Sequence, residues 1–300
     1  MRNAKLFNYL HLHFIVFVWG FTAVLGALIS IGAIPLVWYR MLLATGFILL
    51  YIAHKKIPLR YPVKTVAAFC AVGVLLALHW MAFFGAIKVS NVSVTLAIMS
   101  TGAFFTSILE PLIYKRKVIG YEIFFGLLVV AGLYIIFQVE GDHLYGILLA
   151  LASIFLGALF SVINGRWAKK YGATAISFYE ILTGMLCITV YLAVTGGFSL
   201  SFFNLTTTDW ALLAALASVC TAYAFIASVH VMKWISPYTV MLTTNLEPVY
   251  GIILALLILK DDEYMSPQFY YGALLIIATV VANGFVKLKK DRKKDVSHPS

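Results

Sequence analysis

The chain contains 300 residues, of which 62% are hydrophobic and 11% are Asp, Glu, Lys or Arg. Soluble globular domains carry about 25% charged residues, so this shortage of charge excludes a soluble protein and indicates an integral membrane protein. The formal net charge of +10 could indicate a nucleic-acid-binding protein, but most basic residues lie in short loops and tails beside apolar segments. We interpret the charge as a membrane-topology signal and expect no nucleic-acid partner.

Long apolar segments, separated by charged residues, Gly or Pro, predict transmembrane helices, because crossing the hydrocarbon core takes about 20 apolar residues. Transmembrane β-strands would instead show stretches of about ten residues with alternating polarity. The sequence therefore predicts an all-α polytopic membrane protein. The ten predicted helices, in chain order, cover residues 11–30, 34–53, 64–86, 92–114, 119–138, 144–165, 173–195, 209–231, 238–259 and 267–287.

The charged residues of the loops alternate from one side of the predicted membrane to the other. With a cytoplasmic N-terminus, nearly all Lys and Arg lie on the cytoplasmic side, whereas Glu140, Asp142, Asp209 and residues 261–263 lie outside. Cytoplasmic loops of membrane proteins carry this excess of Lys and Arg. We therefore expect both termini in the cytoplasm, and we expect the first segment to be retained as a helix rather than removed as a signal peptide.

Short segments of the two halves match each other. Residues 93–96 match residues 239–242, and residues 125–128 match residues 271–274 at the same offset. A repeat of five helices enters the membrane from the opposite side in its second copy, and such inverted repeats underlie many secondary transporters. The alternative is a duplication that serves stability alone. We assign the first repeat, the inverted second repeat and a basic cytoplasmic tail to residues 1–140, 141–287 and 288–300.

Several motifs resemble the drug/metabolite transporter superfamily. They are Trp19-Gly20 in the first helix, Arg40 in the second, and the segments at residues 79–93 and 246–251. The two halves resemble paired EamA-type domains of bacterial exporters, and the resemblance covers all ten helices. It implies export across the bacterial inner membrane. It names no substrate, because the superfamily handles amino acids, sugars, nucleotide derivatives and drugs.

Ionisable residues inside the predicted helices are candidate functional groups, because a charge within a span is costly unless it is paired or faces water. Arg40 is either a site for an anionic substrate group, such as a carboxylate, or part of a structural ion pair or interfacial anchor. Tyr179 and Glu180 hold the repeat-related positions in the seventh helix. Opposite charges at equivalent positions would polarise the transport pathway from end to end.

Glu247 lies inside the ninth predicted helix and precedes Pro248. Proline removes an intrahelical hydrogen bond and frees carbonyl groups that can line a cavity. A buried carboxyl group is less costly when it is protonated, so Glu247 is a candidate carrier of a coupling proton. The alternative is a kinked helix in which a neighbour such as Asn245 satisfies the carboxyl group. Asn245 and the nearby Tyr250 are also candidate site residues.

The third predicted helix carries His79 and Trp80, followed by Phe83 and Phe84. These side chains either line an aromatic pocket, which would suit apolar or cationic ligands, or are ordinary packing groups. Trp19 has the same two interpretations.

Glu110 and Glu247 belong to the same Leu-Glu-Pro string in the two halves, but they are displaced from equivalent depth. For Glu110 a salt-bridged helix end is therefore favoured over a transport site. The repeat-related counterpart of Glu247 is Thr101, and Ser100 precedes it. We expect this polar break in the fourth helix to line a cavity.

These patterns predict a secondary active transporter that exports a small metabolite, or an amino-acid-like or amphiphilic drug-like solute, by alternating access. Protons are the candidate coupling ion. The sequence shows no nucleotide-binding loop and no catalytic or metal-ligand spacing, so we expect no enzyme activity, cofactor or metal. An intramembrane enzyme and a passive channel are the alternatives. The expected partners are the small-molecule substrate and the lipid bilayer, with the protein as a monomer or homodimer.

Overall fold

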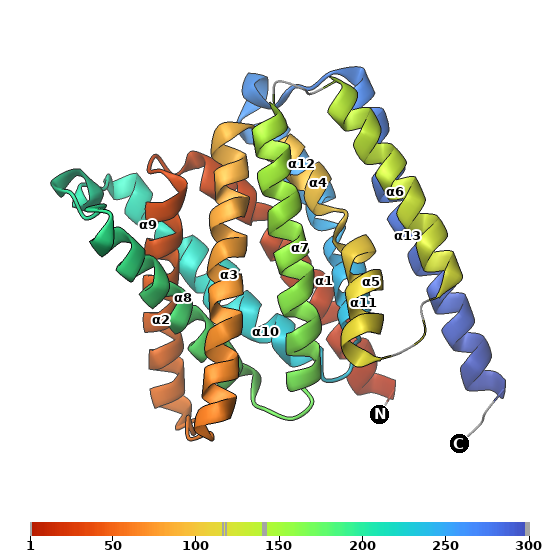
Figure 1. Ribbon diagram of the computed structural model, residues 1–300, viewed down its shortest axis with the longest axis horizontal. Coiled ribbons are helices and arrows are strands. Elements are labelled where there is room, and N and C mark those ends of the chain that lie inside the picture. The colour runs from red at the N-terminus through yellow and green to blue at the C-terminus, as the bar shows by residue number, and fades with distance from the viewer. Residues whose placement is uncertain (1, 116, 118, 140–142, 298–300) are drawn as a thin grey trace.

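The computed structural model describes residues 2–115, 117, 119–139 and 143–297, and its elements there are helices that run between the upper and lower ends of the view in Figure 1. In chain order they are α1 (Arg2–Leu28), α2 (Ala33–Lys55), α3 (Val63–Val89), α4 (Val92–Met99), α5 (Gly102–Tyr114), α6 (Gly120–Val139), α7 (Leu144–Trp167), α8 (Ala173–Val194), η2 (Leu200–Phe203), α9 (Thr207–Ala217), η3 (Ser218–Tyr223), α10 (Ala224–Val231), α11 (Pro237–Thr244), α12 (Glu247–Ile258), η4 (Lys260–Glu263) and α13 (Pro267–Ser297).

The described helices confirm an all-α architecture with many apolar spans. Nine are long and apolar enough to cross a membrane, with α4–α5, α9–α10 and α11–α12 each forming one span. The described part of α6 adds a shorter apolar helix, Ile123–Ile136. The protein is therefore a multi-pass membrane protein, and the ten predicted segments all coincide with helices.

Three segments predicted as continuous helices are interrupted in the structure. The first break lies at Ser100 and Thr101, whose hydroxyl groups donate to the carbonyl groups of Ala97 (2.5 Å) and Ile98 (2.8 Å) in the preceding turn. Such bonds compete with the helical ladder. The second break separates α11 from α12, two residues before Pro248, which has no N–H to donate.

The third interruption is the π-helical turn η3 between α9 and α10. Here the Thr221 hydroxyl donates to the Leu216 carbonyl, five residues earlier, at 2.7 Å. The pattern of apolar residues does not reveal such a turn, because a π-helical turn adds one residue to the helix and leaves the segment as apolar as before.

Both ends of the chain extend beyond the predicted spans. Helix α1 begins at Arg2 rather than at residue 11, and α13 continues to Ser297 through the segment assigned to a tail. Both extensions contain good helix formers such as Leu and Lys, so the helix continues after the apolar run. The acidic residues 140 and 142 lie outside the described part, and so do the side chains of residues 261, 262 and 287–300.

The helix contacts of one half correspond to those of the other. Helix α3 packs on α7 and α8, and the related segment α9–α10 packs on α1 and α2. Helix α5 packs on α7 as α12 packs on α1, and α4 contacts α12 as α11 contacts α5. Helix α1 begins at the lower end of Figure 1, near the C-terminus, whereas α7 begins at the upper end.

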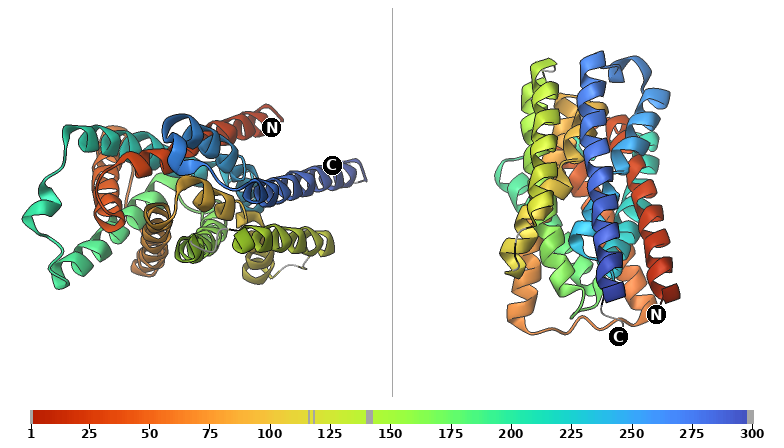
Figure 2. Two further views of the ribbon diagram at one scale, coloured as in Figure 1. Left: turned by 90° about the horizontal axis from the view of Figure 1, so that it is seen from above. Right: turned by 90° about the vertical axis from the view of Figure 1, so that its right-hand side faces the viewer.

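Helices α6 and α13 form a pair at one edge of the bundle (Figure 2). They cross closely at Gly132 and Gly272, where a Cβ added to either residue would lie 3.0 Å from the carbonyl oxygen of the other. Glycine is required at this crossing because a side chain would push the two backbones apart.

A buried carboxylate from the C-terminal half holds the start of α4. Glu263, which is 2% exposed, accepts hydrogen bonds from the backbone N–H groups of Val92 (2.9 Å) and Ser93 (2.7 Å). The first N–H groups of a helix have no partner within the helix, and an anion there is stabilised by the helix dipole. The sequence had placed Glu263 only in an external acidic loop.

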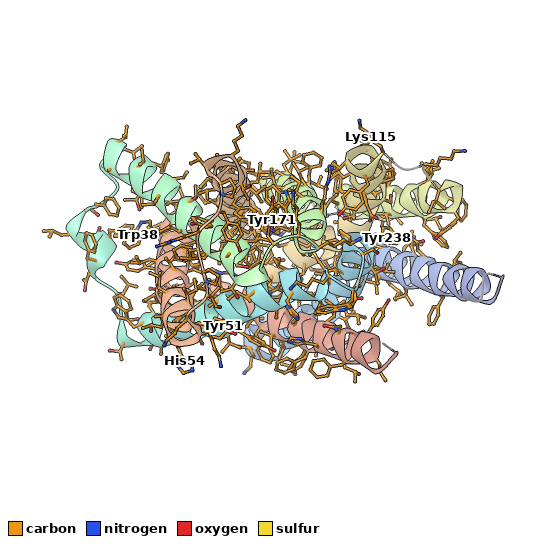
Figure 3. The ribbon with its side chains drawn as sticks, turned by 90° about the horizontal axis from the view of Figure 1, so that it is seen from below. Trp38, Tyr51, His54, Lys115, Tyr171 and Tyr238 are labelled. Carbon is orange, nitrogen blue, oxygen red and sulfur yellow. The ribbon has the colours of Figure 1, made fainter. Side chains whose placement is uncertain are left out.

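The start of α11 has a corresponding cap from the N-terminal half. Glu110 is 6% exposed, and its Oε2 accepts a hydrogen bond from the backbone N–H of Tyr238 at 3.2 Å. Asn283 of α13 donates to the Tyr238 hydroxyl. Figure 3 shows Tyr238 inside the bundle and Lys115 pointing outward at its rim. Glu110 therefore contacts a helix start, a role that the predicted salt-bridged helix end did not include.

Candidate functional site

A cavity of about 90 Å³ lies between the two halves of the chain. Its walls come from α1, α2, α3 and α4 of the first half and from α7, η3, α10, α11 and α12 of the second. A water molecule needs roughly 10–15 Å³ of such space, so the cavity has room for several waters or a small solute. Its lining is largely aromatic rings, Met and aliphatic side chains, with few polar groups.

Arg40 supplies the positive charge of the cavity. It is 2% exposed, and its Nε donates to the Thr221 hydroxyl at 2.6 Å. Its guanidinium carbon lies 4.0 Å from the centre of the Trp80 ring, a distance at which a cation is attracted to an aromatic face. Its Nη1 has no hydrogen-bond partner. Arg40 therefore keeps an unused donor beside the cavity.

Glu247 supplies the acidic group of the cavity. It is the first residue of α12, it lines the cavity, and its side chain is half-buried. Glu247 and Arg40 attract each other electrostatically, although no ion pair within 4.0 Å joins them in the described part of the chain. The break before α12 thus places a carboxyl group in the wall of the cavity that Arg40 also lines, and the buried Nη1 of Arg40 has no hydrogen-bond partner.

His79 lies on the α7 side of the cavity and is held by Ser153. Its Nδ1 lies 2.7 Å from the Ser153 carbonyl oxygen, and the Ser153 hydroxyl donates to the His79 carbonyl at 3.0 Å. A carbonyl oxygen only accepts, so Nδ1 carries the proton in this contact. In a neutral ring, Nε2 is then the acceptor nitrogen. His79 packs edge-on against Phe160, with ring centroids 5.3 Å apart.

Trp19 and Trp80 form part of the aromatic wall. The Trp19 indole donates to the Cys220 carbonyl in η3 at 3.3 Å, and Trp80 packs edge-on against Phe225 of α10. Both rings are therefore fixed by contacts with the opposite half of the chain. Trp19, Trp80, Arg40, His79 and Glu247 are the candidate residues from the sequence that the structure brings together around the cavity.

The polar break in the fourth predicted helix does not line this cavity, contrary to expectation. Ser100 and Thr101 are 1% and 0% exposed, and their hydroxyl groups bond to their own helix. Met99 beside them is the residue of this segment that reaches the cavity wall. A hydroxyl group that donates to a carbonyl group of its own helix has its hydrogen bond already, so it does not need to face a polar cavity.

The remaining candidates also lie away from the cavity wall. Tyr179 donates to the Leu59 carbonyl at 2.7 Å, and Tyr250 packs against Phe17 with ring centroids 5.5 Å apart. Asn245 is 4% exposed and its Nδ2 has no partner. Glu180 is fully buried behind Asn164, which does line the cavity.

Sequence reasoning missed Asn164 and Thr221. Asn164 lies in the last turns of α7 and carries no charge, so it was not singled out among the polar residues of the predicted spans. Thr221 sits in an apolar segment, where one hydroxyl group carries little signal. The clue to both was a polar residue within a predicted span, read together with the ionisable residue of a neighbouring span. In the described part of the chain, no three His, Cys, Asp or Glu residues cluster to hold a metal.

The fold and the cavity define a class: a multi-pass helical membrane protein whose two related halves enclose a small, mostly apolar site with one group of each charge. The sequence model of the EamA-like transporter family matches residues 7–138 and again residues 144–285. The chain therefore belongs to the EamA-like transporter family, which confirms the resemblance seen in its sequence. The family is one of membrane transporters.

Solved structures contain the same fold. Among 26 matching chains, one crystal structure aligns with a TM-score of 0.68 and covers 92% of this chain and 96% of its own, with 14% sequence identity. At this identity the likeness shows the fold alone. A comparison with curated proteins found no match.

Proposed function

We propose that the protein is a secondary active transporter that exports a small metabolite, or an amino-acid-like or amphiphilic drug-like solute, by alternating access. The cavity carries this proposal, because both halves line it and its wall contains both Glu247 and Arg40, whose Nη1 has no hydrogen-bond partner. A zwitterionic solute could place its carboxylate near Arg40 and its ammonium group near Glu247. The aromatic and Met side chains would receive its apolar part.

The arrangement of the helices supports alternating access. Corresponding helices such as α1 and α7 run in opposite directions (Figure 1). Each of them packs against a helix of the other half, since α1 contacts α12 and α7 contacts α5. Two halves related in this way can exchange conformations, so that the same cavity opens first to one side and then to the other. This supports an inverted repeat with its substrate site near the middle of the membrane.

The distribution of basic residues supports a cytoplasmic location for both termini. The loops that follow α2, α5 and α7 lie at the lower end of Figure 1, where the chain also begins and ends, and they carry Lys56, Lys115 and Lys170. Cytoplasmic loops carry such an excess of positive charge. We place the protein in the bacterial inner membrane, with the lower end of Figure 1 in the cytoplasm.

The proposal is tested by transport in cells and in proteoliposomes. The full chain is expressed, and efflux of labelled amino acids, nucleosides and drugs is measured with and without a protonophore. We expect saturable efflux of one class, exchange with external solute, and a loss of concentrative efflux with the protonophore. Flux that neither saturates nor exchanges would indicate a channel, a chemically altered solute would indicate an enzyme, and either result would overturn the proposal.

The Arg40→Gln variant makes this test specific. It removes the guanidinium donors that face the cavity, so transport of an anionic or zwitterionic solute should be strongly reduced. Arg166→Gln is the matched control, because Arg166 is exposed at the end of α7 and does not line the cavity. Equal transport by the two variants would remove Arg40 from the proposed site.

A further inference from the structure

Glu180 on α8 is a carboxyl group with no access to water. It is 0% exposed and does not line the cavity. Its Oε2 accepts a hydrogen bond from Asn164 Nδ2 at 3.0 Å, while its Oε1 has no partner. The Asn164 Oδ1 is also buried without a partner. The pair therefore has one hydrogen bond, and its two other oxygens, Glu180 Oε1 and Asn164 Oδ1, are acceptors without a donor.

In the described part of the chain, no charged side chain on the elements around α8 forms an ion pair with Glu180. These elements are α2, α3 and α10, and α7 contacts α8 through the hydrogen bond from Asn164 to Glu180. On α2, Arg40 is bonded to Thr221 and stacked on Trp80. On α3, His79 is bonded to Ser153.

The other two elements carry their charged groups near their ends. Arg166 of α7 is exposed, and His230 of α10 packs on Trp234 with ring centroids 4.9 Å apart. The described residues therefore offer Glu180 no cation.

Glu180 is 0% exposed and α3 packs closely on its backbone, so a hydrated ion has no access to its carboxyl group. A Cβ added to Gly73 of α3 would lie 2.5 Å from the Glu180 carbonyl oxygen. The neighbouring Ser177 hydroxyl, one turn earlier, is also buried without a partner. A metal ion would need several oxygen ligands and room to reach them, whereas a proton needs neither.

We propose that Glu180 is the proton-binding site of the transporter and that Asn164 connects it with the cavity. An ionised carboxylate in a dry, unpaired position is strongly unfavourable, so Glu180 holds a proton on Oε1 in the present conformation. Asn164 fixes Oε2 and borders the cavity at the same time. Movement of α7 relative to α8 would bring cavity water to Oε1.

The release step is balanced by water alone. The O–H bond at Oε1 breaks, the proton passes to a water molecule of the opened cavity, and the remaining carboxylate keeps its hydrogen bond from Asn164. Uptake is the reverse step from water on the other side. Glu247 would then bind solute while Glu180 binds the proton, so the two carboxyl groups have separate tasks.

The proposal is tested directly by infrared difference spectroscopy on the purified full chain in lipid nanodiscs, titrated with acid and base. We expect a protonated-carboxyl C=O band at neutral pH that disappears in Glu180→Gln and persists in Glu247→Gln. Persistence of the band in Glu180→Gln, or its absence from the unmodified protein, would overturn the assignment. A band that responds to added Na⁺ at fixed pH would overturn it in favour of a metal cation.

A second variant covers the case in which Glu180→Gln does not fold. Asn164→Leu keeps the carboxyl group and removes its hydrogen-bond donor, so the C=O band should shift to higher frequency without disappearing. Glu110→Gln is the matched control, because Glu110 is a buried carboxyl group that caps α11. An unshifted band in Asn164→Leu would contradict the role of Asn164.

The link with transport rests on the proposed function and has its own readout. In proteoliposomes loaded with the exported solute, Glu180→Gln should lose accumulation driven by a pH gradient and keep exchange of labelled for unlabelled solute. Loss of both activities in a folded variant would overturn a purely coupling role. If the unmodified protein exchanges no solute, the proposed function fails, while the infrared result still decides whether Glu180 binds a proton.

Discussion

The two broken helices, α4–α5 and α11–α12, share one architecture and differ in chemistry. Each break is spanned by a short backbone hydrogen bond, from Thr101 N–H to the Ile98 carbonyl and from Leu246 N–H to the Thr243 carbonyl, both at 3.0 Å. Each pair begins with a helix whose N-terminus is capped from the other half, by Glu263 and by Glu110. The caps therefore tie the halves together at two helix starts.

The difference lies at the breaks themselves. Ser100 and Thr101 satisfy their hydroxyl groups within their own helix and are buried. The second break leaves Asn245 Nδ2 without a partner and presents Glu247 to the cavity. The break between α4 and α5 therefore contributes only to helix structure. The break between α11 and α12 places the carboxyl group of Glu247 in the cavity wall.

The largest effect should come from removing the Glu263 cap. Glu263→Ala leaves two buried N–H groups at the start of α4 without an acceptor, at about 1–3 kcal/mol for each. The unfolding temperature of the purified protein in detergent should fall markedly. Glu263→Gln keeps one acceptor oxygen and should lose less. Equal stability of the alanine variant and the unmodified protein would show that the cap adds nothing.

Replacing Glu247 should affect transport rather than stability. Glu247→Gln removes the charge that a cationic group of the solute would contact, and a hydrogen bond to a charged group contributes about 1.5–3 kcal/mol. The apparent affinity for such a solute should fall about 10- to 100-fold. Concentration-dependent efflux measures this, with the unfolding temperature as the control. Unchanged affinity would mean that the open carboxyl group does not bind solute.

A smaller effect on stability is expected at the packing of α12 on α1. A Cβ added to Gly20 would lie 2.7 Å from the Tyr250 Cβ, close to the backbone, so that α1 or α12 must shift. Gly20→Ala should therefore cost about 1–3 kcal/mol. Gly102→Ala in α5 is the matched comparison, because its Cβ would meet the flexible ends of Met241 and Ile154. A larger loss of stability in Gly102→Ala than in Gly20→Ala would contradict the claim that the contact of α1 with α12 is the tighter one.

The smallest effect should follow changes at the first break. Ser100→Ala removes a hydrogen bond of the helix to itself and exposes no unpaired group to the cavity, so the expected loss is about 0.5–1.5 kcal/mol. Efflux kinetics should stay unchanged. A strong transport defect in Ser100→Ala, with normal stability, would show that both breaks take part in transport.

The sequence predicted the helices well because each span must be apolar along about 20 residues. It also identified Arg40, Glu247, His79, Trp80 and Trp19, since ionisable and large aromatic groups inside spans are conspicuous. It could not separate Ser100 from Glu247, because both lie at or beside a break and only three-dimensional contacts show which hydroxyl or carboxyl group is satisfied.

The caps and the polar partners were harder to predict. Glu263 belongs to an acidic loop, and nothing in its sequence context shows that its carboxylate turns inward to Val92 and Ser93. Asn164 and Thr221 owe their importance to side chains on other helices, namely Glu180 and Arg40. Such pairings depend on how helices cross, which the pattern of a single helix does not contain.

The turn η3 makes the cavity wall sensitive to the number of residues as well as to their identity. It places the Cys220 carbonyl against Trp19 and the Thr221 hydroxyl against Arg40. In a regular helix each residue adds about 100° of rotation. Loss of a single codon within Ser218–Tyr223 would therefore turn α10 by that angle and bring a different face of it to the cavity. A one-residue deletion there would rebuild the site more thoroughly than any single substitution.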